Sequence, residues 1–199
     1  MDKKLDELEF QITQFTQAVE DLEANFPDTE VFGSTRARTP IICKYKIRWL
    51  LEVLGEASVE EDVLDAYKHT SERFKQFLDD HRTQYEQSVF EEFDWFAEQY
   101  PKLVCAFLER DPVTNELIET LDRRDTMESL RRYLTQIDSS KSSAVESRID
   151  RATIRINALD EVLRCRFVEN LSEILTDHSH IERSYFPDDF WWRHPEALE

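Results

Sequence analysis

Glycine is nearly missing from this chain, which has only Gly33 and Gly55 among its 199 residues. A dinucleotide-binding loop and a phosphate-binding P-loop both need several glycines close together, because the backbone must approach the phosphates closely. Folds rich in β-structure also need many turn residues. The shortage of glycine therefore excludes both nucleotide motifs and favours a helical chain.

Motifs of metal-dependent and nucleophilic enzymes are also missing. The sequence contains no H-E-x-x-H, no E-x-x-H and no G-x-S-x-G. The best candidate metal ligands are Asp177, His178 and His180, with Glu182 nearby. We prefer to interpret them as a helix terminus, where protonated histidine interacts favourably with the negative end of the helix dipole. We therefore predict no catalytic residue, no metal and no cofactor, and a protein that is not an enzyme.

Cysteines are few and far apart. Cys43, Cys105 and Cys165 are odd in number and each lies among apolar neighbours. This pattern predicts three buried thiols in a reducing compartment, not a disulfide framework or a zinc site. No run approaches the length of apolar sequence that a membrane span needs, and the charged first residues do not resemble a signal peptide. We expect a cytoplasmic protein without membrane contact.

Basic residues are outnumbered, since 25 Lys and Arg against 43 Asp and Glu give a net charge of −18. Such a charge is compatible with an ordinary solvated surface, with adaptation to high salt, or with an acidic surface that meets a basic protein. Bulk binding of nucleic acid is not expected, because phosphates repel this surface.

The chain is rich in apolar residues at helical spacing. From Ser143 to about His178 an uninterrupted stripe marks one long amphipathic helix, and Ser143 to Glu146 reads as a capping box. Its members are Val145, Ile149, Ala152, Ile156, Leu159, Leu163, Phe167, Leu171 and Ile174. Arg148, Arg151 and Arg155 share another face, where Glu146, Asp150 and Asp160 lie at ion-pair spacing, so we predict a solvated, ion-paired face there.

Further helices are predicted along the rest of the chain. Residues 2–25 carry a heptad stripe typical of a coiled coil, whose partner is either this chain or a second copy. A helix is also expected at 41–54, after Thr39 as N-cap and before Gly55 as stop. Residues 58–100, with Ser58 to Glu61 as a capping box, form either one very long helix or two helices with a break near Thr70. A short helix from Pro101 to Leu108 and another from Leu117 to Ile137 complete the set. His81 lies on the apolar stripe of its helix, which favours a core position over a catalytic one.

The fold class that follows is all-α: an antiparallel helical bundle of five or six helices, with two long spine helices. We expect one domain over residues 1–199. It comprises the heptad helix 1–25, a bundle over 40–178 and an aromatic C-terminal tail over 179–199.

Two stretches are candidate binding sites. The tail is rich in large rings, and Tyr185, Phe186, Phe190, Trp191 and Trp192 are predicted to bind a partner or to fold back over the bundle. The main basic cluster comprises Arg36, Arg38, Lys44, Lys46 and Arg48, interleaved with Tyr45 and Trp49. It either binds single-stranded nucleic acid or pairs with the neighbouring acidic helices, and we prefer internal pairing.

The function that these observations favour is a non-enzymatic protein-interaction module: a regulator, an adaptor or an assembly subunit. Long amphipathic helices and an aromatic tail offer surfaces for a protein partner, which the acidity suggests is basic. A homo-oligomer through the N-terminal helix is a further possibility. The alternatives are an acidic inhibitor that imitates nucleic acid on a basic partner, and a nucleic-acid-binding regulator that uses the Arg36–Arg48 cluster.

Overall fold

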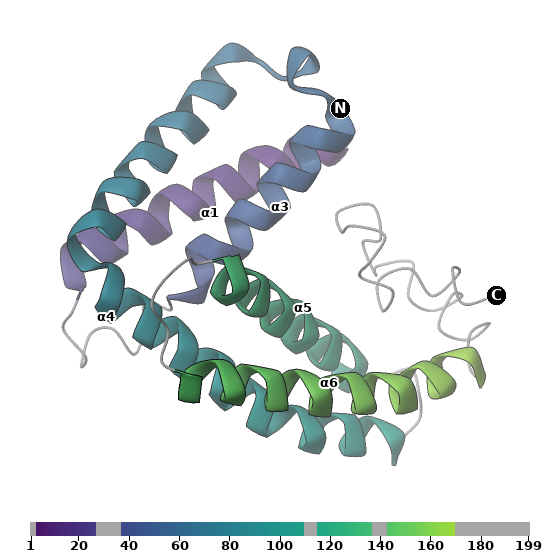
Figure 1. The fold of residues 1–199 in the computed structure, drawn as a ribbon. Helices are drawn as coiled ribbons and strands as arrows, with labels where there is room; N and C mark the ends of the chain where they lie inside the picture. The colour runs from purple at the N-terminus through teal and green to yellow at the C-terminus, as the bar shows by residue number, and fades with distance from the viewer. Residues whose placement is uncertain (1–2, 27–36, 110–114, 137–142, 170–199) are drawn as a thin grey trace. The chain divides into compact units, whose positions relative to one another are not determined.

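A computed structural model of the chain describes residues 3–26, 37–109, 115–136 and 143–169. Within these ranges the backbone forms five α-helices and one 3-10 turn, with no β-strand (Figure 1). The helices are α1 (Lys3–Asn25), α3 (Arg38–Leu54), α4 (Glu61–Leu108), α5 (Asn115–Gln136) and α6 (Ser143–Glu169), and the 3-10 turn is Glu56–Ser58. The all-α prediction is confirmed.

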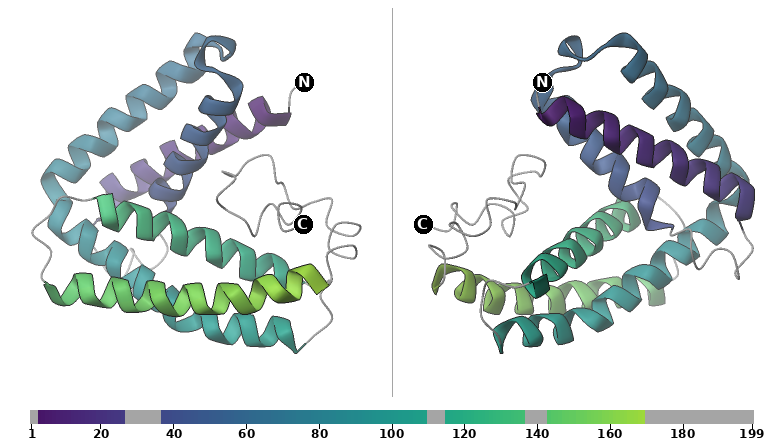
Figure 2. Two further views of the ribbon diagram at one scale, coloured as in Figure 1. Left: turned by 45° about the vertical axis from the view of Figure 1, so that its right-hand side comes forward. Right: turned by 180° about the vertical axis from the view of Figure 1, so that it is seen from behind.

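Contacts within the chain group the residues into two compact units, residues 1–92 and residues 93–199. The boundary lies inside α4, so each unit contains part of that helix. Consecutive helices of each unit run in opposite directions (Figure 2), which is the antiparallel arrangement that short connections predict. That residues 1–199 form one domain stays a prediction.

The heptad stripe of α1 is buried inside the first unit. Leu8, Phe15 and Leu22 are fully buried, and α1 packs against α3. The Phe15 ring also meets Tyr67 and Phe74 of α4, with centroids 6.1 and 5.8 Å away. The partner of this stripe is therefore found within the chain. Self-association through α1 stays a prediction that the fold of this unit does not require.

An aromatic cluster joins the end of α1 to α4. Phe26 packs edge-on against Phe77 at 5.3 Å and lies near His81 at 5.4 Å. The Tyr85 ring is fully buried beside them, and its hydroxyl donates a 2.6 Å hydrogen bond to the carbonyl oxygen of Ala37. Because a buried hydroxyl without a partner is costly, this bond fixes the start of α3 against α4.

Of the predicted ends of α3 and α4, one is confirmed and two are wrong. Gly55 ends α3 with a φ of 77°, a conformation that L side chains rarely adopt, and its N–H donates to the carbonyl of Leu51. Thr39 is not an N-cap, because α3 already begins at Arg38. Ser58 does not cap α4 either: its hydroxyl donates back to the carbonyls of Leu54 and Gly55.

The predicted break before Pro101 is wrong, since α4 continues through this residue to Leu108. Proline within a helix removes one backbone hydrogen bond and costs about 3 kcal/mol. Burial on both sides compensates for this cost, because Tyr100 and Val104 are fully buried one turn apart. The expected short helix is therefore the last part of a 48-residue helix.

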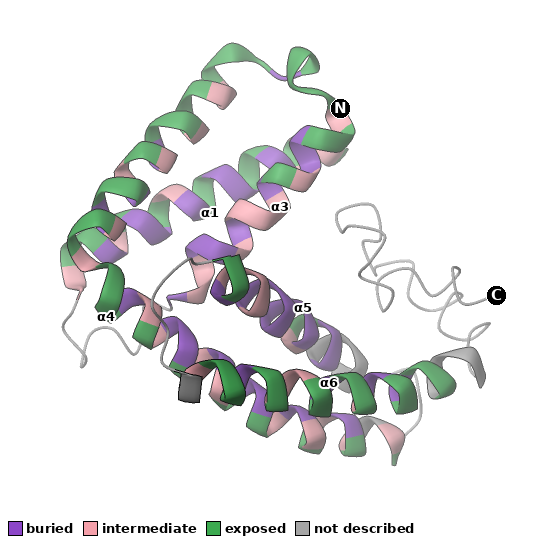
Figure 3. Ribbon diagram, viewed as in Figure 1, coloured by how far each residue is buried: buried purple, intermediate pink, exposed green. Residues whose placement is uncertain are grey.

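The second unit is built from residues 93–108 of α4, α5 and α6. The buried side of α6 follows the predicted stripe, with Ile149, Ile156 and Leu163 at most 4% exposed. From α5, Leu121, Met127 and Leu130 contribute fully buried side chains. Figure 3 shows that α6 keeps a continuous exposed side opposite this core.

Of the three cysteines, only Cys43 is buried, and burial raises the pKa of its thiol to about 11. Cys105 and Cys165 are exposed, so the prediction of buried thiols is wrong for both. The prediction was based on apolar neighbours in the sequence. Residues one or two positions apart lie on different faces of a helix, so such neighbours do not show that a cysteine is buried. No described helix is long and apolar enough to cross a membrane.

Candidate functional site

Charged side chains occupy the interior of the second unit. Arg124 of α5 and Asp160 of α6 are 5% and 6% exposed. Nε and Nη2 of Arg124 lie 2.9 and 2.8 Å from Oδ2 of Asp160, and the hydroxyl of Tyr100 donates a 2.7 Å hydrogen bond to the other carboxylate oxygen. Burial and the neighbouring Asp160 carboxylate raise the pKa of Tyr100 well above its usual range. These three residues join α4, α5 and α6 through one buried ion pair.

Glu128 extends this network along α5. Its carboxylate accepts hydrogen bonds from Arg131 at 2.6 Å, from Arg132 at 2.7 Å and from Arg124 at 3.3 Å. Burial alone would raise the pKa of this carboxyl, but the three guanidinium groups outweigh it and lower the pKa to about 2. With each charge facing an opposite one, we interpret the network as structural rather than reactive.

Lowering the pH should therefore reduce the free energy of unfolding, because Glu128 becomes protonated. A carboxyl whose pKa is lowered by folding contributes stability above its unfolded pKa and loses it as pH falls toward the folded pKa. With pKa values of 4.5 unfolded and about 2 folded, the loss occurs between those values. It amounts to about 3 kcal/mol, at 1.36 kcal/mol per unit. Denaturant unfolding from pH 7 to pH 2 should show a steeper loss in the natural protein than in Glu128→Gln. Parallel curves would contradict this.

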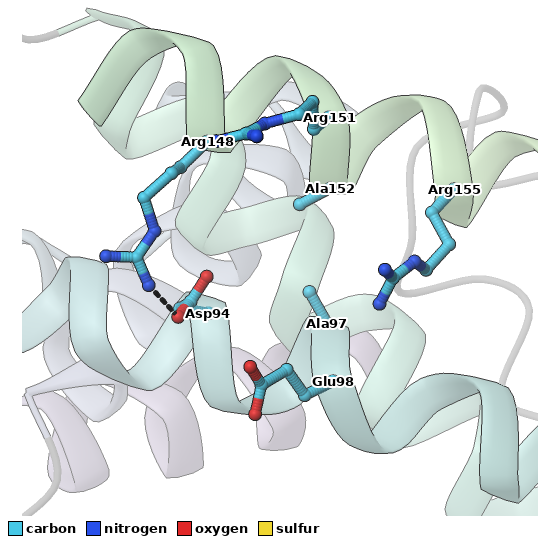
Figure 4. Close-up of a pocket in the computed structure, with 7 residues that line it drawn as sticks. All are labelled: Asp94, Ala97, Glu98, Arg148, Arg151, Ala152 and Arg155. Carbon is cyan, nitrogen blue, oxygen red and sulfur yellow. Dashed lines mark hydrogen bonds and ion pairs between the residues drawn. The ribbon is translucent and has the colours of Figure 1, made fainter. Parts of the chain in front are cut away.

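A pocket of about 280 Å³ lies on the surface of the second unit, between α4 and α6 (Figure 4). Arg148, Arg151 and Arg155 line it from α6, together with Ala152. Asp94, Ala97 and Glu98 line it from α4. Three guanidinium groups and two carboxylates thus surround an alanine floor.

The arginines of this pocket do not pair as their spacing suggests. Arg148 forms an ion pair with Asp94 of α4 instead of a neighbour on α6. Arg151 donates from Nε to the carbonyl of Ser147 at 3.2 Å. Asp160 points into the core toward Arg124, so it is not available to the surface. Within the described part of the chain, Arg151 and Arg155 have no carboxylate partner. This side of α6 is therefore not the ion-paired face that we predicted.

A second feature of α6 is an exposed apolar stripe. Ile154 is 69% exposed and Val162 is 46% exposed, and both belong to the few large apolar side chains that are exposed in the described part of the chain. Ala158 and Cys165 are exposed as well, and steps of 4, 4 and 3 residues place all four on one face. We call Ile154, Ala158, Val162 and Cys165 the α6 stripe.

The predicted basic cluster is only partly available to a ligand. Arg38 forms an ion pair with Glu92 at 3.2 Å, as internal pairing requires. Lys44 lies over the Phe74 ring at 5.8 Å, and burial, followed by the charge of Arg48, lowers its pKa. Arg48 is exposed, Lys46 is half-buried, and Arg36 lies outside the described residues. Tyr45 and Trp49 are half-buried, so neither presents a fully open ring.

The two other candidate sites lie outside the described residues. They are the aromatic tail residues Tyr185, Phe186, Phe190, Trp191 and Trp192, and the residues considered as metal ligands, Asp177, His178, His180 and Glu182. Among the residues that the structure does describe, no group of three His, Cys, Asp or Glu side chains could hold a metal ion.

Comparison of the chain with protein-family models, with curated proteins and with solved structures finds no match.

Proposed function

We propose that this protein is a non-enzymatic interaction module, an adaptor or regulatory subunit in the cytoplasm, and that α6 carries a surface for a protein partner. The observation that carries the proposal is the α6 stripe. Single exposed apolar residues are normal, but a row of them on one helix face commonly marks an interaction site. The opposite face of the same helix is buried in its own unit, so the stripe is not needed for folding.

Charges beside the stripe indicate the chemistry of the partner. Arg151 and Arg155 lie beside the stripe on one side and Glu161 on the other, while Asp150 precedes Ile154 by one helical turn. A helix that docks here would place apolar residues on the stripe and acidic residues beside the two arginines. Such a helix resembles the amphipathic segments that bind hydrophobic surfaces through apolar anchors at helical spacing. The aromatic tail, Tyr185 to Trp192, would provide a second contact.

Interruption of the stripe should remove partner binding without unfolding the protein. In Ile154→Glu with Val162→Glu, both new charges lie on exposed positions, so stability should change by less than about 1 kcal/mol while binding falls about tenfold or more. The matched control is Asn157→Glu, which adds a charge to an exposed position of α6 away from the stripe.

The measurement is cross-linking at α6, followed by identification of the partner and titration with its purified binding segment. An acidic amphipathic helix that binds the natural protein and the control, but not the double variant, supports the proposal. Concentration-dependent sedimentation would instead identify a second copy as the occupant. Equal binding by all three proteins would contradict a role for the stripe.

The acidic-inhibitor alternative keeps one supporting fact, the net charge of −18. An inhibitor that imitates nucleic acid would compete with DNA or RNA for a basic target, and its binding would weaken steeply with salt. The stripe proposal predicts a weaker dependence on salt, because burial of apolar surface contributes the larger part of the affinity. The α6 stripe favours the interaction module.

A further inference from the structure

The pocket between α4 and α6 has an unusual charge for this protein. In a chain of net charge −18, its lining holds three arginines against two carboxylates. One arginine, Arg148, is neutralised by its ion pair with Asp94. Arg151 and Arg155 add two positive charges at the same opening, and the remaining carboxylate is that of Glu98. With Arg148 paired, the lining of the pocket therefore keeps a net positive charge.

The charged side chains that line the pocket point in different directions (Figure 4). Figure 4 shows Arg155 reaching from α6 toward α4, with its guanidinium group over the opening between the helices. Arg151 extends along α6 toward Arg148, and Glu98 turns its carboxylate toward Asp94 rather than toward Arg155. The floor between them is Ala97, which is 4% exposed, and Ala152. Small residues at the floor leave room that a longer side chain would fill.

We propose that this pocket binds a small phosphate monoester that carries a hydroxyl group. Guanidinium groups present planar pairs of N–H donors that match the oxygens of a phosphate, and they stay charged at any physiological pH. The volume of about 280 Å³ fits one phosphate with a few attached atoms, and it is at or below the smallest sites of drug-sized ligands. Glu98 gives the second part of the specificity: its carboxylate repels a bare anion but accepts a hydrogen bond from a ligand hydroxyl.

Isothermal titration calorimetry of the full chain with glycerol phosphate, inorganic phosphate, acetate and glycerol tests the proposal. Glycerol phosphate should bind more tightly than inorganic phosphate, acetate should bind about tenfold or more weakly than either, and glycerol should not bind. Arg151→Ala with Arg155→Ala should remove phosphate binding. The matched control, Arg164→Ala, changes an exposed arginine of α6 that does not line the pocket, and it should keep the binding.

Replacement of Glu98 separates this pocket from a merely positive surface. In Glu98→Ala, affinity for inorganic phosphate should rise, because a repulsive charge is lost, while the preference for glycerol phosphate over phosphate should disappear. Equal weakening of all anions by salt, with no effect of the paired arginine replacement, would overturn the proposal. Because Ile154→Glu with Val162→Glu leaves the pocket lining unchanged, loss of partner binding and loss of phosphate binding can be told apart.

Discussion

Replacing Asp160 by alanine is expected to lower the free energy of unfolding by about 3–5 kcal/mol, because the buried guanidinium group of Arg124 loses its nearer carboxylate, at 2.8 Å, and keeps the more distant one of Glu128, at 3.3 Å. Asp160 is 6% exposed and accepts hydrogen bonds from both Arg124 and Tyr100. The alanine variant leaves a guanidinium group and a hydroxyl without their shared acceptor. Guanidinium denaturation followed by circular dichroism measures the loss.

Two further variants show whether the pairing, rather than the size of the side chain, sets this loss. Asp150→Ala removes an exposed carboxylate from the same helix and should change stability by about 0.5 kcal/mol or less. Replacing the whole group, with Asp160→Leu, Arg124→Leu and Tyr100→Phe, should cost less than Asp160→Ala alone, since no unpaired charge remains. An Asp160→Ala variant as stable as Asp150→Ala would contradict the buried pair.

This network could have been predicted from the sequence, because a charged residue occupies a position on the apolar stripe of a helix. Asp160 lies four residues after Ile156 and three before Leu163, so it occupies the same stripe as the buried residues of α6. Arg124 lies three residues after Leu121 on α5. A charge on a buried stripe requires an opposite charge on a facing helix, because an isolated buried ion is too costly. The prediction that Asp160 belongs to the solvated face of α6 is therefore wrong.

The helices themselves were predictable because hydrophobic period and stop signals are local. The stripes of α1 and α6 and the stop at Gly55 depend only on residues a few positions apart. The predicted helix break before Pro101 is wrong because it depends on more than local sequence. The cost of this proline is local, whereas the burial of Tyr100 and Val104 that offsets this cost comes from other helices. Such tertiary compensation leaves no mark in the neighbouring sequence.

The pocket was beyond sequence reasoning for a similar reason. Arg148, Arg151 and Arg155 share a face at helical spacing, and that part was visible. Asp94 and Glu98 lie on a different helix, about fifty residues earlier in the chain, and only the packing of α4 beside α6 brings them to the arginines. Spacing within one helix cannot tell whether a charge pairs along the helix or across to another one.

Phe15→Ala is expected to cost about 3–5 kcal/mol, which is the usual loss when a buried phenylalanine is truncated and leaves a cavity. Phe15 is fully buried and its ring packs against Tyr67 and Phe74. The matched control is Phe10→Ala on the same helix, where the ring is 54% exposed and the loss should be within about 0.5 kcal/mol. Denaturant unfolding at several protein concentrations measures both.

A loss that is independent of concentration places the heptad stripe in the core of its own unit, as the ring contacts indicate. Because unfolding of an oligomer also separates its subunits, a midpoint that rises with concentration in the natural protein and not in Phe15→Ala would instead show that α1 pairs with a second copy.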